Sequence, residues 1–210
     1  MQRYFFIISF IGSDINESFL IGRCLKILHG FYHHNEIHDI GVSFPQWSNE
    51  SIGRSLAFIS ANASSLKFLA NQKYFRDMQQ LKYFEISQIQ VCELTKENSV
   101  LFFRNQQLDK ITPTAQKRKL KRFLSRAEKR GELYTPKIRQ TQLREFELSH
   151  KIPMTSKGNQ NNYAIHIQKK TFSESNTDKF NSYGLSTNQQ IANPVPKNFP
   201  SIQASESKSK

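Results

Sequence analysis

The chain contains six histidines, and His29 is the one whose predicted position best suits acid–base chemistry. A helical pattern of apolar residues runs from Asn16 to about Phe31, and His29 projects away from the apolar side of that helix. Gly30 predicts the helix end, where the helix dipole favours a protonated imidazole. Because imidazole titrates near neutral pH, His29 is a candidate general base or acid. The alternative is an ordinary surface histidine.

Three further histidines follow closely and raise the possibility of a metal site. His29 and His33 have the i,i+4 spacing of two ligands on one helix face. A structural zinc site needs four ligands, and no cysteine or well-spaced carboxylate joins His33, His34 and His38. The sequence therefore predicts a polar loop here, with no metal and no cofactor.

The segment between Thr112 and Gly131 carries eight lysines and arginines against one acid, Glu128. Thr112 fits a helix N-cap, Pro113 a first helical position and Gly131 a helix end, so we predict a helix. A narrow apolar stripe that we expect to pack against the protein is formed by Leu120, Phe123, Leu124 and Ala127. A helix with so little internal neutralisation indicates a polyanionic partner, and a solvated basic surface is the alternative.

The whole chain is basic, with a formal net charge of +13. Such a charge attracts nucleic-acid phosphates or an anionic membrane surface. No segment approaches the roughly 18 apolar residues of a membrane span, and the apolar run from Tyr4 to Ile11 lacks a signal-peptide cleavage site. We therefore expect no membrane contact and no secretion. The separated Cys24 and Cys92 are typical of buried thiols in a reducing cytoplasm.

Apolar periodicity in the first half of the chain predicts alternating strands and helices. The expected strands cover residues 3–11, 40–44, 55–60 and 82–91, and the expected helices cover 16–31 and 64–78. This βαββαβ order is the ferredoxin-like arrangement that RNA-recognition modules also use, and we place it at residues 1–94. The aromatic octamer with which those modules stack bases is missing, so stacking on this sheet is not expected.

The remainder of the chain is predicted to form a second, smaller unit over residues 95–193, which makes the fold class α+β. It contains short strands at 100–103 and 163–167, the basic helix, and a polar connection through about Lys151. Residues 194–210 are rich in Pro, Ser, Lys and Asn, which predicts a disordered tail.

Several short motifs occur together in one order. The pair Leu28-His29 is followed by IGVSFP at 40–45, by an Arg-x-Gln pair at Arg104 and Gln106, and by YGLS at 183–186. In these motifs the chain resembles the type I-F CRISPR repeat-processing endoribonucleases, of the Csy-four type, from residue 1 to about 195. The segments KILHGF at 26–31 and YFEIS at 83–87, with the tryptophan after IGVSFP, resemble most closely the variant found in CRISPR-associated transposons.

The resemblance implies metal-independent cleavage of precursor CRISPR RNA at the 3′ base of a repeat hairpin. The ribose 2′-hydroxyl would attack the adjacent phosphate and leave a 2′,3′-cyclic phosphate. It implies that His29 is the general base, that Ser156 holds the 2′-hydroxyl in line and that Tyr183 orients the histidine. Taken alone, Ser156 would be a turn serine and Tyr183 a half-buried aromatic.

The resemblance also implies a set of RNA contacts at the stem. Arginine pairs geometrically with guanine and glutamine with adenine, which suits base-edge contacts at the end of the stem. Lysine replaces a family arginine at position 119 and phenylalanine another at 123, so the contact set is expected to be shifted. The expected RNA-binding residues are Arg104, Gln106, Arg118, Lys119, Arg122, Arg126 and Tyr163.

The implied partners are the CRISPR RNA repeat hairpin, the backbone subunits of the guide-RNA surveillance complex and, in the transposon variant, a transposition adaptor protein. Two other functions stay open at this point. The chain could be a hairpin-binding scaffold of the same complex without cleavage activity, or a basic RRM-like or DNA-binding module unrelated to CRISPR. The presence of His29, Ser156 and Tyr183 together favours the enzyme.

Overall fold

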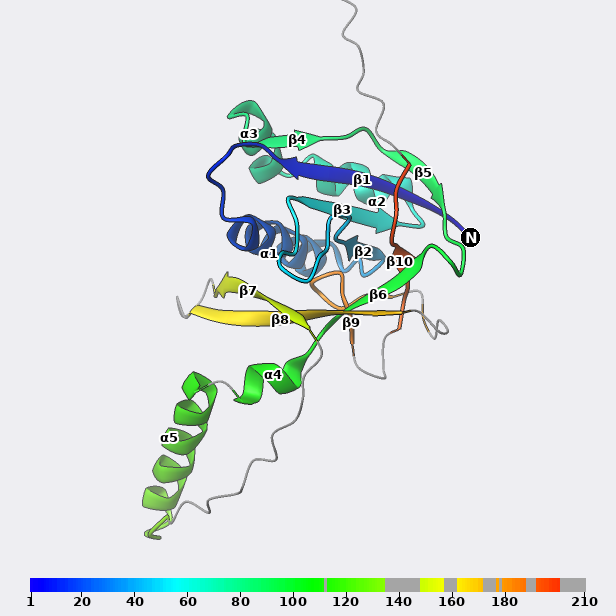
Figure 1. Cartoon of the computed structure of the whole chain (residues 1–210). Helices are drawn as coiled ribbons and strands as arrows, with labels where there is room; N and C mark the ends of the chain where they lie inside the picture. Colours follow the sequence, from blue (N-terminus) through cyan, green and yellow to red (C-terminus); the bar gives the residue numbers. More distant parts are fainter. Residues whose placement is uncertain are drawn as a thin grey trace, which may run out of the picture.

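The first half of the chain folds into a five-stranded antiparallel sheet (Figure 1). The structure is a computed structural model, and it describes residues 1–111, 113–134, 148–156, 162–171, 177, 179–187 and 192–200. Strands β1 (Gln2–Phe10), β2 (Ile40–Ser43), β3 (Ser55–Ser60) and β4 (Phe84–Ile86) follow the order β2-β3-β1-β4, and β5 (Gln90–Glu93) also pairs with β1. This order confirms the predicted ferredoxin-like arrangement.

Helix α1 (Glu17–Asn35) is longer than predicted. Asn16 caps its start, with the side-chain oxygen accepting from the Phe19 N–H at 2.9 Å. The helix does not end at Gly30, because the following Phe31 and Tyr32 are buried and continue the apolar side. It ends at Asn35, where Glu36 takes a left-handed conformation with φ 55°. The predicted helix end at Gly30 is therefore wrong.

Two other predicted elements are each divided in the structure. The second helix is broken at Asn71 and Gln72 into α2 (Ala63–Ala70) and α3 (Lys73–Gln80). The fourth strand is interrupted at Ser87, whose side-chain oxygen accepts from the Ile7 N–H at 2.9 Å while its own N–H donates to the Ile7 carbonyl. This pairing replaces the regular ladder between β4 and β5.

The second half of the chain forms another five-stranded sheet, in the order β10-β6-β8-β7, with β9 (Ser186–Thr187) parallel to β6. Strands β6 (Ser99–Arg104) and β8 (Asn162–Thr171) contain the two strands predicted from sequence. Strand β7 (Ser149–Thr155) was not predicted, and it begins inside the segment expected to be a polar connection. The rest of that connection lies outside the described residues.

The two sheets share one hydrophobic core. Phe44, just after β2, contacts Phe102 of β6 with ring centroids 4.9 Å apart, and α1 packs directly against β7. Buried residues of both halves form one cluster, which includes the free thiols of Cys24 and Cys92. The division near residue 95 therefore separates two sheets but not two cores.

The tail predicted to be disordered from residue 194 is partly built into this core. Strand β10 (Val195–Pro196) pairs with β6, and the Ser43 hydroxyl donates to the Pro196 carbonyl at 2.7 Å. Phe199 contacts Phe5 with ring centroids 4.8 Å apart. The prediction is wrong for these residues because Val195 is buried and Phe199 is partly buried against the core, and residues 201–210 lie outside the described part.

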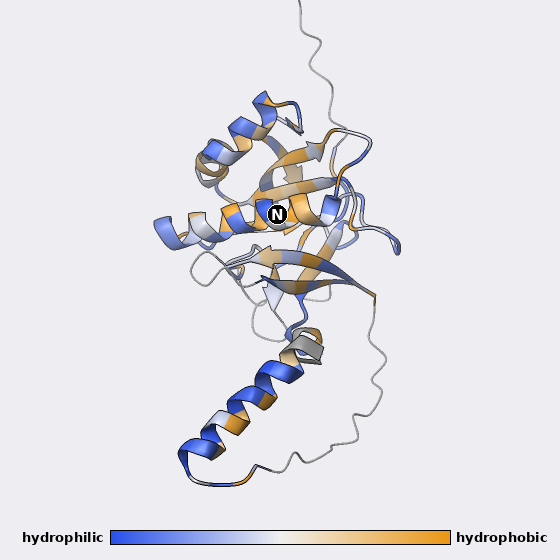
Figure 2. Cartoon of the chain, turned by 90° about the vertical axis from the view of Figure 1, so that its left-hand side faces the viewer, coloured by the Kyte–Doolittle hydropathy of each residue, from blue (hydrophilic) through white to orange (hydrophobic). Residues whose placement is uncertain are grey.

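The basic helix projects from the body of the molecule (Figures 1 and 2). It follows the short helix α4 (Gln106–Ile111) and forms α5 (Pro113–Lys129), as predicted. Gly131 has a φ of +68° and the Glu132 N–H donates back to the Ala127 carbonyl at 2.9 Å, which is a glycine-type helix end. The predicted N-cap, Thr112, lies outside the described residues.

Candidate functional site

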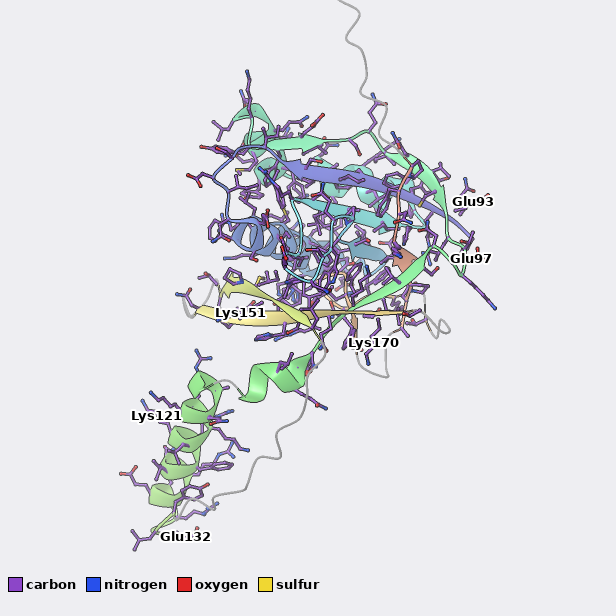
Figure 3. All side chains as sticks on the ribbon, in the orientation of Figure 1. Glu93, Glu97, Lys121, Glu132, Lys151 and Lys170 are labelled. Carbon is purple, nitrogen blue, oxygen red and sulfur yellow. The ribbon has the colours of Figure 1, made fainter. Side chains whose placement is uncertain are left out.

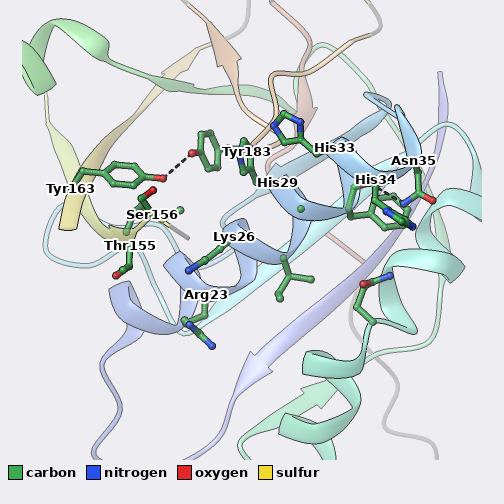
Figure 4. A pocket seen from close by; sticks show the side chains of 15 residues that line it. Arg23, Lys26, His29, His33, His34, Asn35, Thr155, Ser156, Tyr163 and Tyr183 are labelled. Atoms are coloured by element: carbon green, nitrogen blue, oxygen red, sulfur yellow. Dashed lines mark hydrogen bonds between the residues drawn. The ribbon is translucent and has the colours of Figure 1, made fainter. Parts of the chain in front are cut away.

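His29 lies on α1 with its half-buried ring in a cleft (Figure 4). Burial, together with the nearby His33, lowers the pKa of His29 below its usual 6.5, and the Ser182 backbone acts in the opposite direction. Because α1 continues past Gly30, the ring does not occupy the last helical turn. The prediction of a dipole-favoured, protonated imidazole is therefore corrected: His29 is predominantly neutral at pH 7.

Tyr183 covers one face of the His29 ring. The two rings are stacked, with centroids 4.7 Å apart and an interplanar angle of 11°. The Tyr183 hydroxyl makes a 2.9 Å hydrogen bond with the Tyr163 hydroxyl on β8. Burial, with a smaller contribution from Tyr163, raises the pKa of Tyr183, so it is an uncharged phenol at neutral pH. Tyr183 thus acts on His29 through position and desolvation.

The loop that carries Tyr183 is fixed by Asn181 and Gly184. The Asn181 side-chain oxygen accepts from the N–H groups of Tyr183 at 2.8 Å and Leu185 at 3.1 Å. Gly184 has a φ of +72°, and a β-carbon there would lie 2.8 Å from a methyl carbon of Leu28. Its carbonyl accepts from the Val42 N–H at 2.9 Å. The IGVSFP and YGLS motifs are therefore in direct contact.

Ser156 reaches the same cleft from the end of β7 (Figure 4). Its position depends on the close approach of β7 to α1. A β-carbon on Gly22 of α1 would lie only 2.4 Å from the Pro153 carbonyl oxygen, so any larger residue would force the strand outward. Gly22 thus allows Ser156 and His29 to share one cavity.

This cleft has a volume of about 730 Å³ and lies between α1, the β7–β8 end of the second sheet and the Tyr183 loop. Sequence reasoning did not single out two of its cationic lining residues, Arg23 and Lys26, although Lys26 lies three positions before His29 on the same helix side, which was a usable signal. His33 and His34 also line the cleft, and the prediction that they lie in a polar loop is wrong because α1 continues to Asn35. No aspartate or glutamate is among the described lining residues.

Arg104 and Gln106 flank the turn from β6 into α4. The guanidinium carbon of Arg104 lies 5.8 Å from the centroid of the Tyr183 ring, so this residue borders the cleft. Gln106 is exposed at the first position of α4. Between them, the buried Asn105 accepts from the Gln107 N–H at 2.9 Å and donates to Gln168 at 2.8 Å. Asn105 therefore caps α4 and orients both neighbours.

The predicted basic residues of α5 form a second surface beside the cleft. Arg118 donates to the Asn162 carbonyl at the start of β8 at 3.4 Å, which links the helix to the sheet. A further cavity of about 320 Å³ on the helix is bordered by Lys119, Arg122, Arg126 and Phe123. Figure 3 shows Lys121 on the part of α5 that extends away from the body.

The apolar stripe of α5 does not pack as predicted. Leu120 and Leu124 remain 40% and 47% exposed, whereas Ala127 is buried. Phe123 stacks on Tyr134 with centroids 5.5 Å apart, so its partner is the chain just after the helix. The expectation of a stripe packed on the body is wrong because α5 contacts mainly α4 and not the core.

Within the described residues, no three or more histidine, cysteine, aspartate or glutamate side chains gather as metal ligands would. None of the helices in the described ranges is both long and apolar enough to cross a bilayer.

Comparison with known proteins supplies the family. The model of "CRISPR-associated protein (Cas_Csy4)" matches residues 4–197. No curated protein matches the chain. The solved structure "Crystal structure of Cas6b" shows 13% identity over 88% of this chain and 97% of its own, with a TM-score of 0.29. Another, "Structural Genomics, protein YJCS", shows 18% identity over 45% of this chain and 100% of its own, with a TM-score of 0.28.

At such low TM-scores neither likeness bears on function, and the family match decides the assignment. It spans most of the residues. Of the motifs that carry the resemblance, His29 and Tyr183 line one cleft, and the IGVSFP strand bonds to Gly184 of YGLS. The chain therefore belongs to the Cas_Csy4 family of CRISPR-associated proteins, as its motifs predicted.

Proposed function

We propose that the chain is an endoribonuclease that cuts precursor CRISPR RNA at the 3′ base of the repeat hairpin and stays bound to the hairpin as a subunit of the guide-RNA complex. Membership of the Cas_Csy4 family supports a role in CRISPR repeat processing. One observation best supports cleavage: His29 is neutral and is stacked on Tyr183 in a cationic cleft. Ser156 lines the same cleft.

In this proposal His29 removes the proton from the ribose 2′-hydroxyl. The 2′-oxygen then attacks the adjacent phosphorus, and the bond to the 5′-oxygen of the next nucleotide breaks. The 5′-oxygen takes up a proton from solvent, so that a 2′,3′-cyclic phosphate and a 5′-hydroxyl result. A base must be unprotonated before it can act, and the lowered pKa of His29 satisfies this at neutral pH. Ser156 holds the attacking hydroxyl, and Tyr183 keeps the imidazole in one orientation.

Binding and cleavage would use neighbouring surfaces. Arg118, Lys119, Arg122 and Arg126 of α5 present positive charge suited to the phosphates of the stem. Arg104 and Gln106, at the border of the cleft, would read base edges at the end of the stem, with Tyr163 beside them. A broad contact area of this kind explains why the product would remain bound.

The decisive experiment is the end chemistry of a repeat transcript incubated with the protein in excess EDTA. We expect cleavage with a 2′,3′-cyclic phosphate in the wild type and none in His29→Ala, whose hairpin affinity should stay nearly unchanged. A requirement for added metal would contradict the mechanism. So would equal loss of cleavage and binding in the variant, because a general base contributes little to ground-state affinity.

The same assay separates the remaining alternatives. A wild-type protein that binds the hairpin without cutting it would be a scaffold subunit. If the wild-type protein shows no preference for the hairpin over an unstructured RNA, the result would contradict the proposed CRISPR function. The transposon subtype and its adaptor partner stay predictions, which co-purification with a transposition protein encoded nearby would test.

A further inference from the structure

Arg23 and Lys26 are the two cations of the cleft that the proposed cleavage does not use. Both lie on α1, within two turns of His29, and both line the same cavity (Figure 4). Lys26 is partly buried and Arg23 is exposed. Their side chains give the α1 side of the cleft a positive charge that is separate from the basic surface of α5.

The position of Arg23 is fixed by an aromatic side chain. Its guanidinium carbon lies 5.4 Å from the centroid of the Tyr74 ring on α3, a cation–π geometry, and Arg23 also hydrogen-bonds the Tyr74 side chain. Within the described residues, the ion pair formed is between Arg130 and Glu132, just after the end of α5. Within the described part of the chain, neither Arg23 nor Lys26 is therefore neutralised by a carboxylate. This is expected of a site that binds an anion.

The path of the RNA follows from the two basic surfaces. Arg118 contacts the start of β8, and Tyr163 and Ser156 reach the cleft from that same end of the sheet. A stem held by α5 would thus enter the cleft from the side of the sheet. Beyond Ser156, the α1 side of the same cleft is lined by Lys26 and Arg23 (Figure 4).

We propose that Arg23 and Lys26 bind backbone phosphates of the single-stranded RNA on the 3′ side of the cleaved bond. This inference rests on the proposed function, in which cleavage occurs at the 3′ base of the hairpin, so that the strand continuing past His29 is the 3′ flank. Separately placed cations that follow a backbone are the usual means of holding single-stranded RNA without reading its sequence. The site would hold the leaving strand in line and release it after cleavage.

The test compares two RNAs at several salt concentrations. One is the product hairpin, which ends at the cleavage site. The other carries several additional 3′ nucleotides and a 2′-deoxyribose at the attacking position, so that it cannot be cut. We expect Arg23→Ala/Lys26→Ala to lose about tenfold in affinity for the extended RNA and to flatten its salt slope by about 1.4, at about 0.7 per single-strand phosphate. Affinity for the product hairpin should not change.

The matched control is Lys67→Ala/Arg76→Ala, which removes the same two charges from exposed positions on α2 and α3 outside the cleft. It should leave both affinities almost unchanged. The charge-keeping variant Arg23→Lys/Lys26→Arg should retain most of the preference for the extended RNA. An equal loss for both RNAs, or no loss for either, would overturn the 3′-flank site while leaving hairpin binding by the wild type intact. Failure of the wild type to bind either RNA would instead reject the proposed function and this site with it.

Discussion

At the scale of single residues, the proposed cleavage depends on whether His29 is neutral when the RNA binds. The sequence identified this histidine and its exposure to a cleft, but it placed Gly30 at the helix end and so reversed the expected direction of the pKa shift. The error came from burial of Phe31 and Tyr32, which keep α1 helical for another turn and a half. Such tertiary burial overrides the local signal of a glycine. The stacking partner Tyr183 could be found only through the family motif.

The first prediction concerns the titration of His29. In the folded, RNA-free protein its pKa should lie below 6.5, because burial and His33 both disfavour the imidazolium. The unfolded chain then takes up the proton more readily, so His29 lowers folding stability as the pH falls through 6.5 and costs nothing above it. NMR titration of the imidazole in native protein, with urea-unfolded protein as the reference, measures the shift. A native midpoint above the unfolded one would contradict this account.

The second prediction concerns Asn181, a positioning residue that does not line the cleft. Asn181→Ala removes the acceptor of two loop N–H groups and should cost about 2 kcal/mol of stability, at about 1 kcal/mol each. The Tyr183 ring would then be released from His29, so the cleavage rate should fall about tenfold and the His29 pKa should rise toward 6.5. Asn181→Asp keeps the acceptor and is the control. Slower cleavage without a change in the His29 titration would show a merely structural role.

At the scale of elements, the contact between α1 and β7 assembles the cleft, and it was invisible in the sequence. Pro153 lies in the middle of β7, and proline is disfavoured within a central strand. The strand exists because β7 is the edge of its sheet, where a missing N–H costs no ladder bond. Gly22 was not singled out in the sequence, yet its missing side chain sets the distance between helix and strand.

Gly22→Ala should therefore destabilise the protein by about 1–3 kcal/mol, the usual cost of overpacking, and should slow cleavage by displacing Ser156. Gly30→Ala on the same helix is the matched control for stability, since a β-carbon there meets nothing within 4 Å. It should stabilise the fold by about 0.5–1 kcal/mol, the ordinary gain over glycine in a helix. Denaturant unfolding of both variants measures the contrast. Equal changes in unfolding free energy would mean that β7 moves away from α1 at no cost in stability.

Helix α5 was predicted almost to the residue, because its caps and charges are local signals. We expect Arg118→Ala/Arg122→Ala to weaken hairpin binding and to reduce the salt slope by up to about 1.8, at about 0.9 per duplex phosphate. The control Lys117→Ala/Lys121→Ala removes equal charge from an adjacent side of the helix, about 100° around its axis at 3.6 residues per turn. Filter binding across a salt series distinguishes the pairs, and an unchanged slope in the first would place α5 outside the RNA interface.

At the scale of the whole molecule, sequence periodicity predicted the first sheet correctly because strands such as β1 and β3 each bury a continuous apolar set. It missed β9 and β10, since strands of two residues have no periodicity and form only where a partner strand is already in place. It also missed the shared core, because contacts such as Phe44 with Phe102 join residues remote in sequence. Residues 194–200 were predicted to be part of a disordered tail because that prediction used composition alone.

The last prediction follows from that correction. Removing residues 194–210 deletes the β10 pairing with β6, the bond from Ser43 to Pro196 and the contact of Phe199 with Phe5. Because these contacts join both sheets to one core, the truncated chain should lose several kcal/mol of stability and unfold in a single transition of lower midpoint. Truncation after Pro200 removes none of these contacts and is the control. If both truncations left the denaturation midpoint unchanged, Val195 and Phe199 would contribute no stability, and the C-terminal segment would be the dispensable tail that its composition suggests.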